Sequence, residues 1–210
     1  MSNRNLFGGA ITANLPPSYG DVSNVRQIPD HQEVFVDNES EASVIVELLQ
    51  LESSFQDLEA IRHHFQDLSD ANEATDTKII SEGSFTAEEF IPSLTAVDCK
   101  HALIGKQTVG KYRTRSDMEV DEVYIILVLV RLANVSTDLL VSMNIPARMF
   151  APTTTTTANN NTTTSNSTEP ELNVAQLLPS IGTDMTIHKN VSTMRDFVNS
   201  LHVADWGLFC

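Results

Sequence analysis

The chain has 210 residues, 41% of them hydrophobic, and 28 acidic against 13 basic side chains give it a net charge of −15. This charge opposes binding to nucleic acid or to an anionic membrane surface, because both need clustered basic side chains. It favours a partner with a basic face, although a negative charge can also serve solubility alone. The length fits one domain or two small ones, and we expect a single domain over residues 1–210.

The two cysteines, Cys99 and Cys210, lie far apart and match neither a disulfide framework nor a metal-ligand pattern. No signal peptide is predicted, because the first apolar run is short and is interrupted by Gly8 and Gly9. The longest apolar run, residues 123–130, is too short to span a bilayer. We therefore expect a soluble protein of a reducing compartment that holds no metal and no cofactor.

The N-terminal part of the chain predicts three short strands. Residues 6–15 form the first, which is weakened by the glycine pair inside it and ended by the proline pair that follows. Residues 33–37 and 43–51 form the next two, because both are rich in β-branched or aromatic side chains.

A helix is expected after these strands. Ser54 can cap it, with Asp57 three residues later as a short version of the capping box. His63 and His64 fall inside this helix and point about 100° apart, so they suit a joint metal site poorly and are expected at the surface or at a satisfied boundary. Apolar side chains recur at helical spacing: Phe55, Leu58, Ile61, Phe65 and Leu68.

Further strands follow the helix. Their ranges are 76–85, 96–109 with Gly105 as a bend, 119–133 and 139–145, the last ended by Pro146. This order predicts an antiparallel meander rather than alternating strand–helix–strand units.

The C-terminal third begins with a segment rich in threonine and asparagine, residues 151–170, which we expect to be a flexible loop. A short helix is expected at 172–178, and a longer one capped by Ser192 should lie back across the sheet. Residues 203–209, which contain a tryptophan and a phenylalanine, should be pinned to the core.

A polar cluster stands between a proline turn and a strand. Asp30, His31, Gln32 and Glu33 follow Pro29, which restricts the local backbone. Polar side chains held on such a loop by a rigid scaffold often bind partners. The other interpretation is an ordinary turn whose side chains satisfy nearby backbone groups.

Motifs for catalysis are missing from the sequence. It contains no glycine-rich phosphate loop, no nucleophile elbow and no zinc-ligand spacing. Asp30 and Glu33 could be paired carboxylates, and a hydrolase could use Asp30 with His31, but no nucleophile or electrophilic stabiliser stands near them. We expect no substrate chemistry of the protein's own.

Several stretches resemble the Ran guanine nucleotide release factors, also called the MOG family. The resemblance spans both ends of the chain, and the threonine/asparagine insertion departs from it. The matching stretches are Leu6-Phe7-Gly8-Gly9-Ala10, Asp21-Val22-Ser23, Arg26, Pro29-Asp30, Gln32-Glu33-Val34-Phe35, residues 43–49, Thr137-Asp138-Leu139-Leu140 and Asp205-Trp206-Gly207-Leu208-Phe209.

The resemblance implies an α+β fold, an α/β/α sandwich around a mainly antiparallel sheet, similar to the PsbP-like extrinsic proteins of photosystem II. It implies binding to the small GTPase Ran, release of its guanine nucleotide, and a role in nuclear protein import, with the protein in the nucleus and also in the cytoplasm. Nothing in the sequence indicates an obligate dimer, so we expect a monomer.

The family's implicated acidic pair falls on Asp30 and Glu33. We expect Gln32 to be an orienting hydrogen-bond partner for them. His31 stands where many relatives carry asparagine. We hypothesise that the two carboxylates engage basic or metal-linked groups on Ran, since a GTPase holds its nucleotide through a lysine and a magnesium ion. The alternative is an adaptor of the same fold that binds Ran without affecting exchange.

Overall fold

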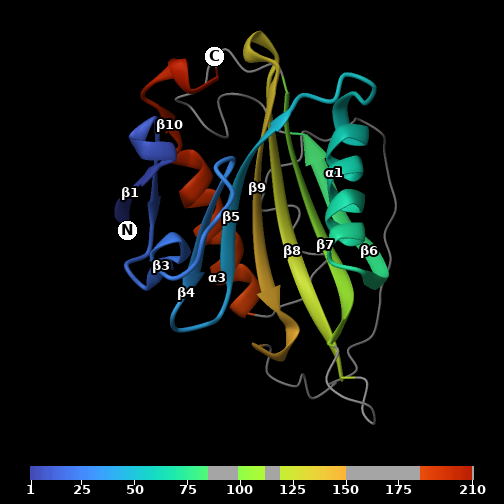
Figure 1. The fold of residues 1–210 in the computed structure, drawn as a ribbon. Helices are drawn as coiled ribbons and strands as arrows, with labels where there is room; N and C mark the ends of the chain where they lie inside the picture. Colours follow the sequence, from blue (N-terminus) through green and yellow to red (C-terminus); the bar gives the residue numbers. More distant parts are fainter. Residues whose placement is uncertain (85–98, 112–118, 150–184, 210) are drawn as a thin grey trace, which may run out of the picture.

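The computed structural model describes residues 1–84, 99–111, 119–149 and 185–209 (Figure 1). The predicted loop at 151–170 and the predicted helix at 172–178 lie outside these ranges. The two α-helices described are α1 (Asp57–Ala71) and α3 (Met185–Asn199). The strands are β1 (Ser2–Leu6), β2 (Ile11–Leu15), β3 (Tyr19–Asp21), β4 (Gln32–Asp37), β5 (Ser43–Gln50), β6 (Ala74–Ser84), β7 (Cys99–Lys111), β8 (Glu119–Leu132), β9 (Thr137–Pro146) and β10 (His202–Val203). Short 3-10 turns are η1 (Phe7–Gly9), η2 (Val22–Asn24), η3 (Ala133–Val135), η4 (Ala147–Met149) and η6 (Trp206–Phe209).

The strands form two sheets. The larger has seven strands in the order β3-β4-β5-β9-β8-β7-β6, and the smaller has the order β1-β2-β10. All the strand pairs within the described ranges are antiparallel, as the sequence predicted. Chain neighbours are sheet neighbours almost throughout, apart from the step from β5 to β9, which pairs residues 43–50 with residues 137–144 at the centre of the sheet.

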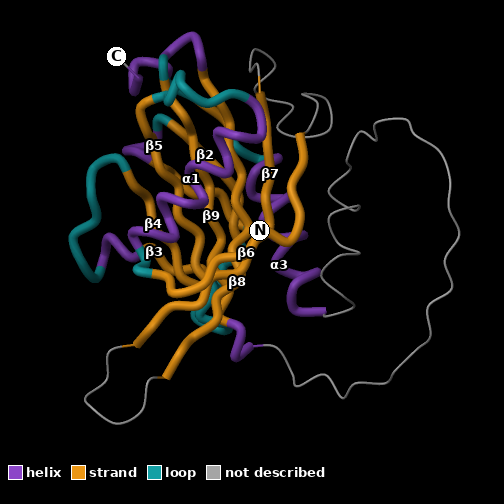
Figure 2. Tube along the Cα trace, turned by 90° about the vertical axis from the view of Figure 1, so that its right-hand side faces the viewer, coloured by secondary structure: helices purple, strands orange, loops and turns teal. Residues whose placement is uncertain are grey.

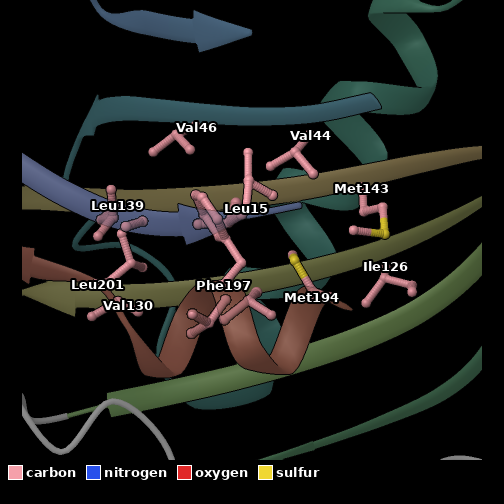
Figure 3. Close-up of a cluster of buried hydrophobic side chains, with 14 of the residues drawn as sticks. Leu15, Val44, Val46, Ile126, Val130, Leu139, Met143, Met194, Phe197 and Leu201 are labelled. Atoms are coloured by element: carbon pink, nitrogen blue, oxygen red, sulfur yellow. The ribbon is translucent and has the colours of Figure 1, made fainter. Parts of the chain in front are cut away.

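The large sheet is covered on both faces by helices (Figure 1). Side chains alternate along each strand, so Ile126 and Val128 of β8 face α3 while Ile125 and Leu127 face α1. Figure 3 shows the α3 side, where Phe197, fully buried, packs among strand side chains. The predicted position of the C-terminal helix across the sheet is therefore confirmed. Figure 2 shows the same elements after a turn of 90°, with the helices in purple and the strands in orange.

Gly105 lies at an irregular point of the sheet and also serves packing. The pairing of β7 with β8 runs through Gly105 without a shift, whereas the pairing with β6 shifts register there, between Ile79, which pairs with Gly105, and Ser81, which pairs with Ile104. A Cβ atom at Gly105 would lie 2.2 Å from Cζ of Phe65, which is far inside contact distance. The missing side chain lets this phenylalanine of α1 press against the sheet.

The predicted strand at 6–15 is a hairpin instead. Phe7, Gly8 and Gly9 all have positive φ, of 50°, 68° and 96°, and reverse the chain between β1 and β2. Glycine adopts such angles without steric cost, so the pair makes the turn rather than weakening a strand. The hairpin exposes an edge of β2 on which β10 pairs, and Phe209 packs against the core as expected, whereas Trp206 is 40% exposed.

Two predicted helix starts are wrong. Helix α1 begins at Asp57 with Gln56 as its N-cap and no capping side chain, so Ser54 does not cap it. Helix α3 already begins at Met185, and Ser192 lies inside it. Packing of the apolar faces fixed both helices, because helix stability in proteins depends mostly on tertiary burial.

Candidate partner-binding site

The turn before β4 is built from backbone hydrogen bonds. The Gln32 N–H donates to the Pro29 carbonyl over 2.9 Å, and the Leu48 N–H of β5 donates to the His31 carbonyl over 2.9 Å. Asp30 and His31 stand exposed at this turn, immediately before the strand. The prediction that a rigid strand fixes this loop is borne out by these contacts.

Glu33 joins the two sheets. It lies on β4 of the large sheet, and its Oε1 accepts the N–H of Phe7 from the hairpin of the small sheet over 2.5 Å. Burial raises the pKa of the Glu33 carboxyl; the Phe7 N–H partly offsets this, and the charge of Asp21 raises it further. The hydrogen bond fixes the position of the carboxylate, while burial and the charge of Asp21 make its ionised form less favourable.

Gln32 is also held, but by a different group. Its side-chain amide donates to Oε1 of Glu47 over 2.6 Å, across the β4–β5 pair. The amide is thus engaged by β5 rather than by Asp30 or Glu33, and an orienting role toward those two carboxylates finds no hydrogen bond here.

A surface pocket of about 400 Å³ opens beside this turn. It collects three of the four predicted site residues, Asp30, Gln32 and Glu33, whereas His31 is not part of its wall. Part of its apolar wall comes from opposite ends of the chain, from Phe7 and Leu208. Arg26 supplies a cation. Sequence reasoning missed the pocket's apolar half, because no local pattern shows that residues 7 and 208 meet.

A second polar cluster is buried between α1 and the sheet. Asp138, fully buried, accepts from Nε of Arg131 over 3.0 Å and lies 3.1 Å from Nε2 of His64. The guanidinium of Arg131 also donates to the carbonyls of Glu52 and Phe55, over 2.5 and 2.6 Å. Burial opposes ionisation of Asp138, but the hydrogen bonds and charges of His64 and Arg131 outweigh it and lower its pKa.

This cluster ties the β5–α1 connection to β8 and β9. His64 is a satisfied boundary histidine, one of the two outcomes expected from the sequence, and His63 pairs at the surface with Asp67 at 3.3 Å. Arg131 was missed, although an arginine at the end of an apolar strand signals a buried partner.

The described ranges offer neither a metal-binding cluster nor a helix that could span a membrane. They contain no group of three or more histidine, cysteine, aspartate or glutamate side chains arranged to hold a metal ion. Neither of their two α-helices has the length and apolar character needed to cross a membrane.

Replacing Glu33 by glutamine should leave the protein at least as stable as the wild type at pH 7. Because burial raises the pKa of this carboxyl, ionised Glu33 is less favourable in the folded chain than in the unfolded one. Glutamine removes the charge and keeps an oxygen for the Phe7 N–H. Urea unfolding should show that the free energy of unfolding of the wild type rises relative to that of this variant as the pH falls from 7 toward 4.

The matched variant Glu33→Ala removes the acceptor as well and should lose about 1–3 kcal/mol through the unpaired Phe7 N–H. Equal losses for the two variants at pH 7 would contradict this view of the carboxylate.

Comparisons with known proteins agree with one another. A family described as "Ran-interacting Mog1 protein" matches residues 4–146. A probable Ran guanine nucleotide release factor of Dictyostelium discoideum is 36% identical over 154 residues, which cover 73% of this chain and 77% of that protein. The Ran guanine nucleotide release factor of Danio rerio is 37% identical over 150 residues, 69% of this chain and 78% of that protein. The crystal structure of the Saccharomyces cerevisiae Ran-binding protein Mog1p matches over the full length of both chains with a TM-score of 0.66 and 25% identity.

Proposed function

The chain belongs to the Ran-interacting Mog1 protein family, and from this membership we propose that it binds the small GTPase Ran and promotes release of its guanine nucleotide. Relatives named as nuclear import proteins in two yeasts support a role in nuclear protein import. In this proposal the protein acts as a monomer in the nucleus and also in the cytoplasm. It regulates a GTPase, catalyses no reaction of its own, and binds neither nucleic acid nor a membrane directly.

The acidic pocket between the two sheets is the observation that carries this proposal. Its wall presents Asp30, exposed at the turn, and Glu33, fixed by the Phe7 N–H. A GTPase holds its nucleotide through a phosphate-binding lysine and a magnesium ion. Carboxylates can compete with phosphate oxygens for such a lysine or perturb the metal site.

We assign Asp30 and Glu33 to contact with Ran, and Gln32 and His31 to the surface around them. Gln32 holds its place through Glu47, and His31 is exposed next to Asp30. The negative charge of the whole chain, −15, adds attraction toward basic groups during encounter. We propose likewise that residues 1–210 form a single domain and that its fold is similar to that of the PsbP-like proteins.

A release factor must prefer one state of its partner. A ligand shifts an equilibrium only by the difference between its affinities for the two states. We expect the protein to bind nucleotide-free Ran at least tenfold more tightly than Ran loaded with GDP or GTP, a difference of about 1.4 kcal/mol or more. Calorimetric titration of both forms measures this ratio, and equal affinities would favour the adaptor without exchange activity.

A further inference from the structure

The acidic pocket has an apolar half formed by the C-terminal turn. Leu208 of η6 lies in the same wall as Phe7, Asp30 and Glu33. The turn is anchored there, because the Ala204 N–H donates to the Ala10 carbonyl over 2.8 Å next to the β10–β2 pair. Figure 1 shows this red C-terminal segment beside the blue N-terminal hairpin.

Trp206 belongs to the same short turn and is poorly covered. Its side chain is 40% exposed, although large apolar side chains that are this exposed are few in the described ranges. The turn itself is ordered: the Gly207 N–H donates to Oδ1 of Asp205 over 2.8 Å, and the Trp206 and Phe209 rings lie 5.6 Å apart. Val25, which precedes Arg26 of the pocket wall in the chain, is 87% exposed.

An exposed tryptophan in the turn that supplies a pocket wall is typical of a protein-binding surface. Tryptophan, tyrosine and arginine are enriched among the residues whose truncation most weakens binding. A lysine or arginine side chain has an apolar stem and a charged head, so it needs apolar walls and a carboxylate together. The pocket offers Phe7 and Leu208 for the stem and Asp30 and Glu33 for the head, with Arg26 as the one opposing charge in its wall.

We propose that η6 forms the apolar half of the Ran-binding surface, with Trp206 as a contact residue and the adjoining pocket receiving a lysine or arginine side chain of Ran. This inference rests on the proposed function and adds contact residues from the end of the chain. It also explains why η6 leaves its tryptophan side chain 40% exposed, while Leu208 and Phe209 pack against the core.

Fluorine NMR tests this contact directly, because Trp206 is the one tryptophan of the sequence. Protein labelled with 5-fluorotryptophan should give one resonance, and unlabelled nucleotide-free Ran adds none. The resonance should shift or broaden as Ran is added and saturate with the binding curve. An unchanged resonance at saturating Ran would overturn the contact while leaving Ran binding in place.

Substitutions give the energetic test. Trp206→Ala should weaken binding to nucleotide-free Ran at least tenfold, and Trp206→Phe should restore part of the loss. The matched control is Ile79→Ala, since Ile79 is 37% exposed on β6 at the opposite edge of the large sheet from β3 and β4. This control should leave the affinity within twofold of the wild type, and thermal unfolding should show all three variants folded.

Filling the pocket from within tests its occupant. Leu208→Lys would place an ammonium group against the same carboxylates and should weaken Ran binding at least tenfold. Wild-type affinity in this variant or in Trp206→Ala would overturn the inference without touching the proposed function. Failure of the wild-type protein itself to bind Ran would contradict both this inference and the proposed function.

Discussion

Asp30→Ala combined with Glu33→Gln should weaken binding to nucleotide-free Ran at least a hundredfold, which corresponds to about 2.7 kcal/mol. Truncating one partner of a charge pair that is buried and hydrogen-bonded in an interface typically costs about 2–5 kcal/mol, and this variant removes two carboxylates that we assign to such pairs. Asp30 is exposed and free to reach a partner, and glutamine keeps the hydrogen bond from Phe7. Calorimetric titration measures the loss, and thermal unfolding should show little change in stability.

A second double variant separates contact from overall charge. Glu59→Gln with Asp70→Ala removes the same two negative charges from exposed positions on α1, away from the pocket. Its affinity for Ran should stay within a few-fold of the wild type, with a slower encounter as its main effect. Equal losses for the two double variants would mean that the net charge acts on Ran, and not the two carboxylates of the pocket.

Asp138→Asn should have the largest effect on folding, a loss of about 3–5 kcal/mol in the free energy of unfolding. Asp138 is fully buried and compensates Arg131, which would be left buried without a counter-charge. Because His64 and Arg131 lower the pKa of Asp138, its stabilisation is present above the unfolded pKa near 3.9 and is lost as the pH falls through the folded value. Urea unfolding at pH 7 measures the loss in the variant, and urea unfolding in acid measures the pH dependence of the wild type.

The exposed pair of His63 and Asp67 provides the control for this variant. Asp67→Asn should change the free energy of unfolding by no more than about 0.5 kcal/mol. Replacing Arg131 and Asp138 together by apolar residues of similar size should cost less than Asp138→Asn alone, because no charge is then left unpaired. A loss for Asp138→Asn as small as that for Asp67→Asn would contradict the assignment.

The strands of the large sheet were predictable because their residue types are typical of β-strands. β5, β8 and β9 carry runs of β-branched and large aliphatic side chains, and their observed bounds differ from the expected ones by only one or two residues. Strand β3 was missed, since three residues ending in Gly20 and Asp21 carry no such signal and depend on pairing with β4.

The site was predictable only in part. The turn at Asp30 and Glu33 follows from Pro29 and the strand after it, both of which are local features. The pocket depends on the meeting of residues 7 and 208, which follows from the hairpin turn at Gly8 and the β10–β2 pairing. Such long-range contacts are fixed by tertiary packing, and no local pattern near either residue specifies them.

The release of labelled nucleotide from Ran at saturating protein tests the central claim most directly. Fluorescent GDP or GTP bound to Ran should dissociate faster with the wild-type protein than with buffer, and the Asp30→Ala, Glu33→Gln variant should lose most of this acceleration. Dissociation at the unassisted rate, with the protein shown to be bound, would contradict the account.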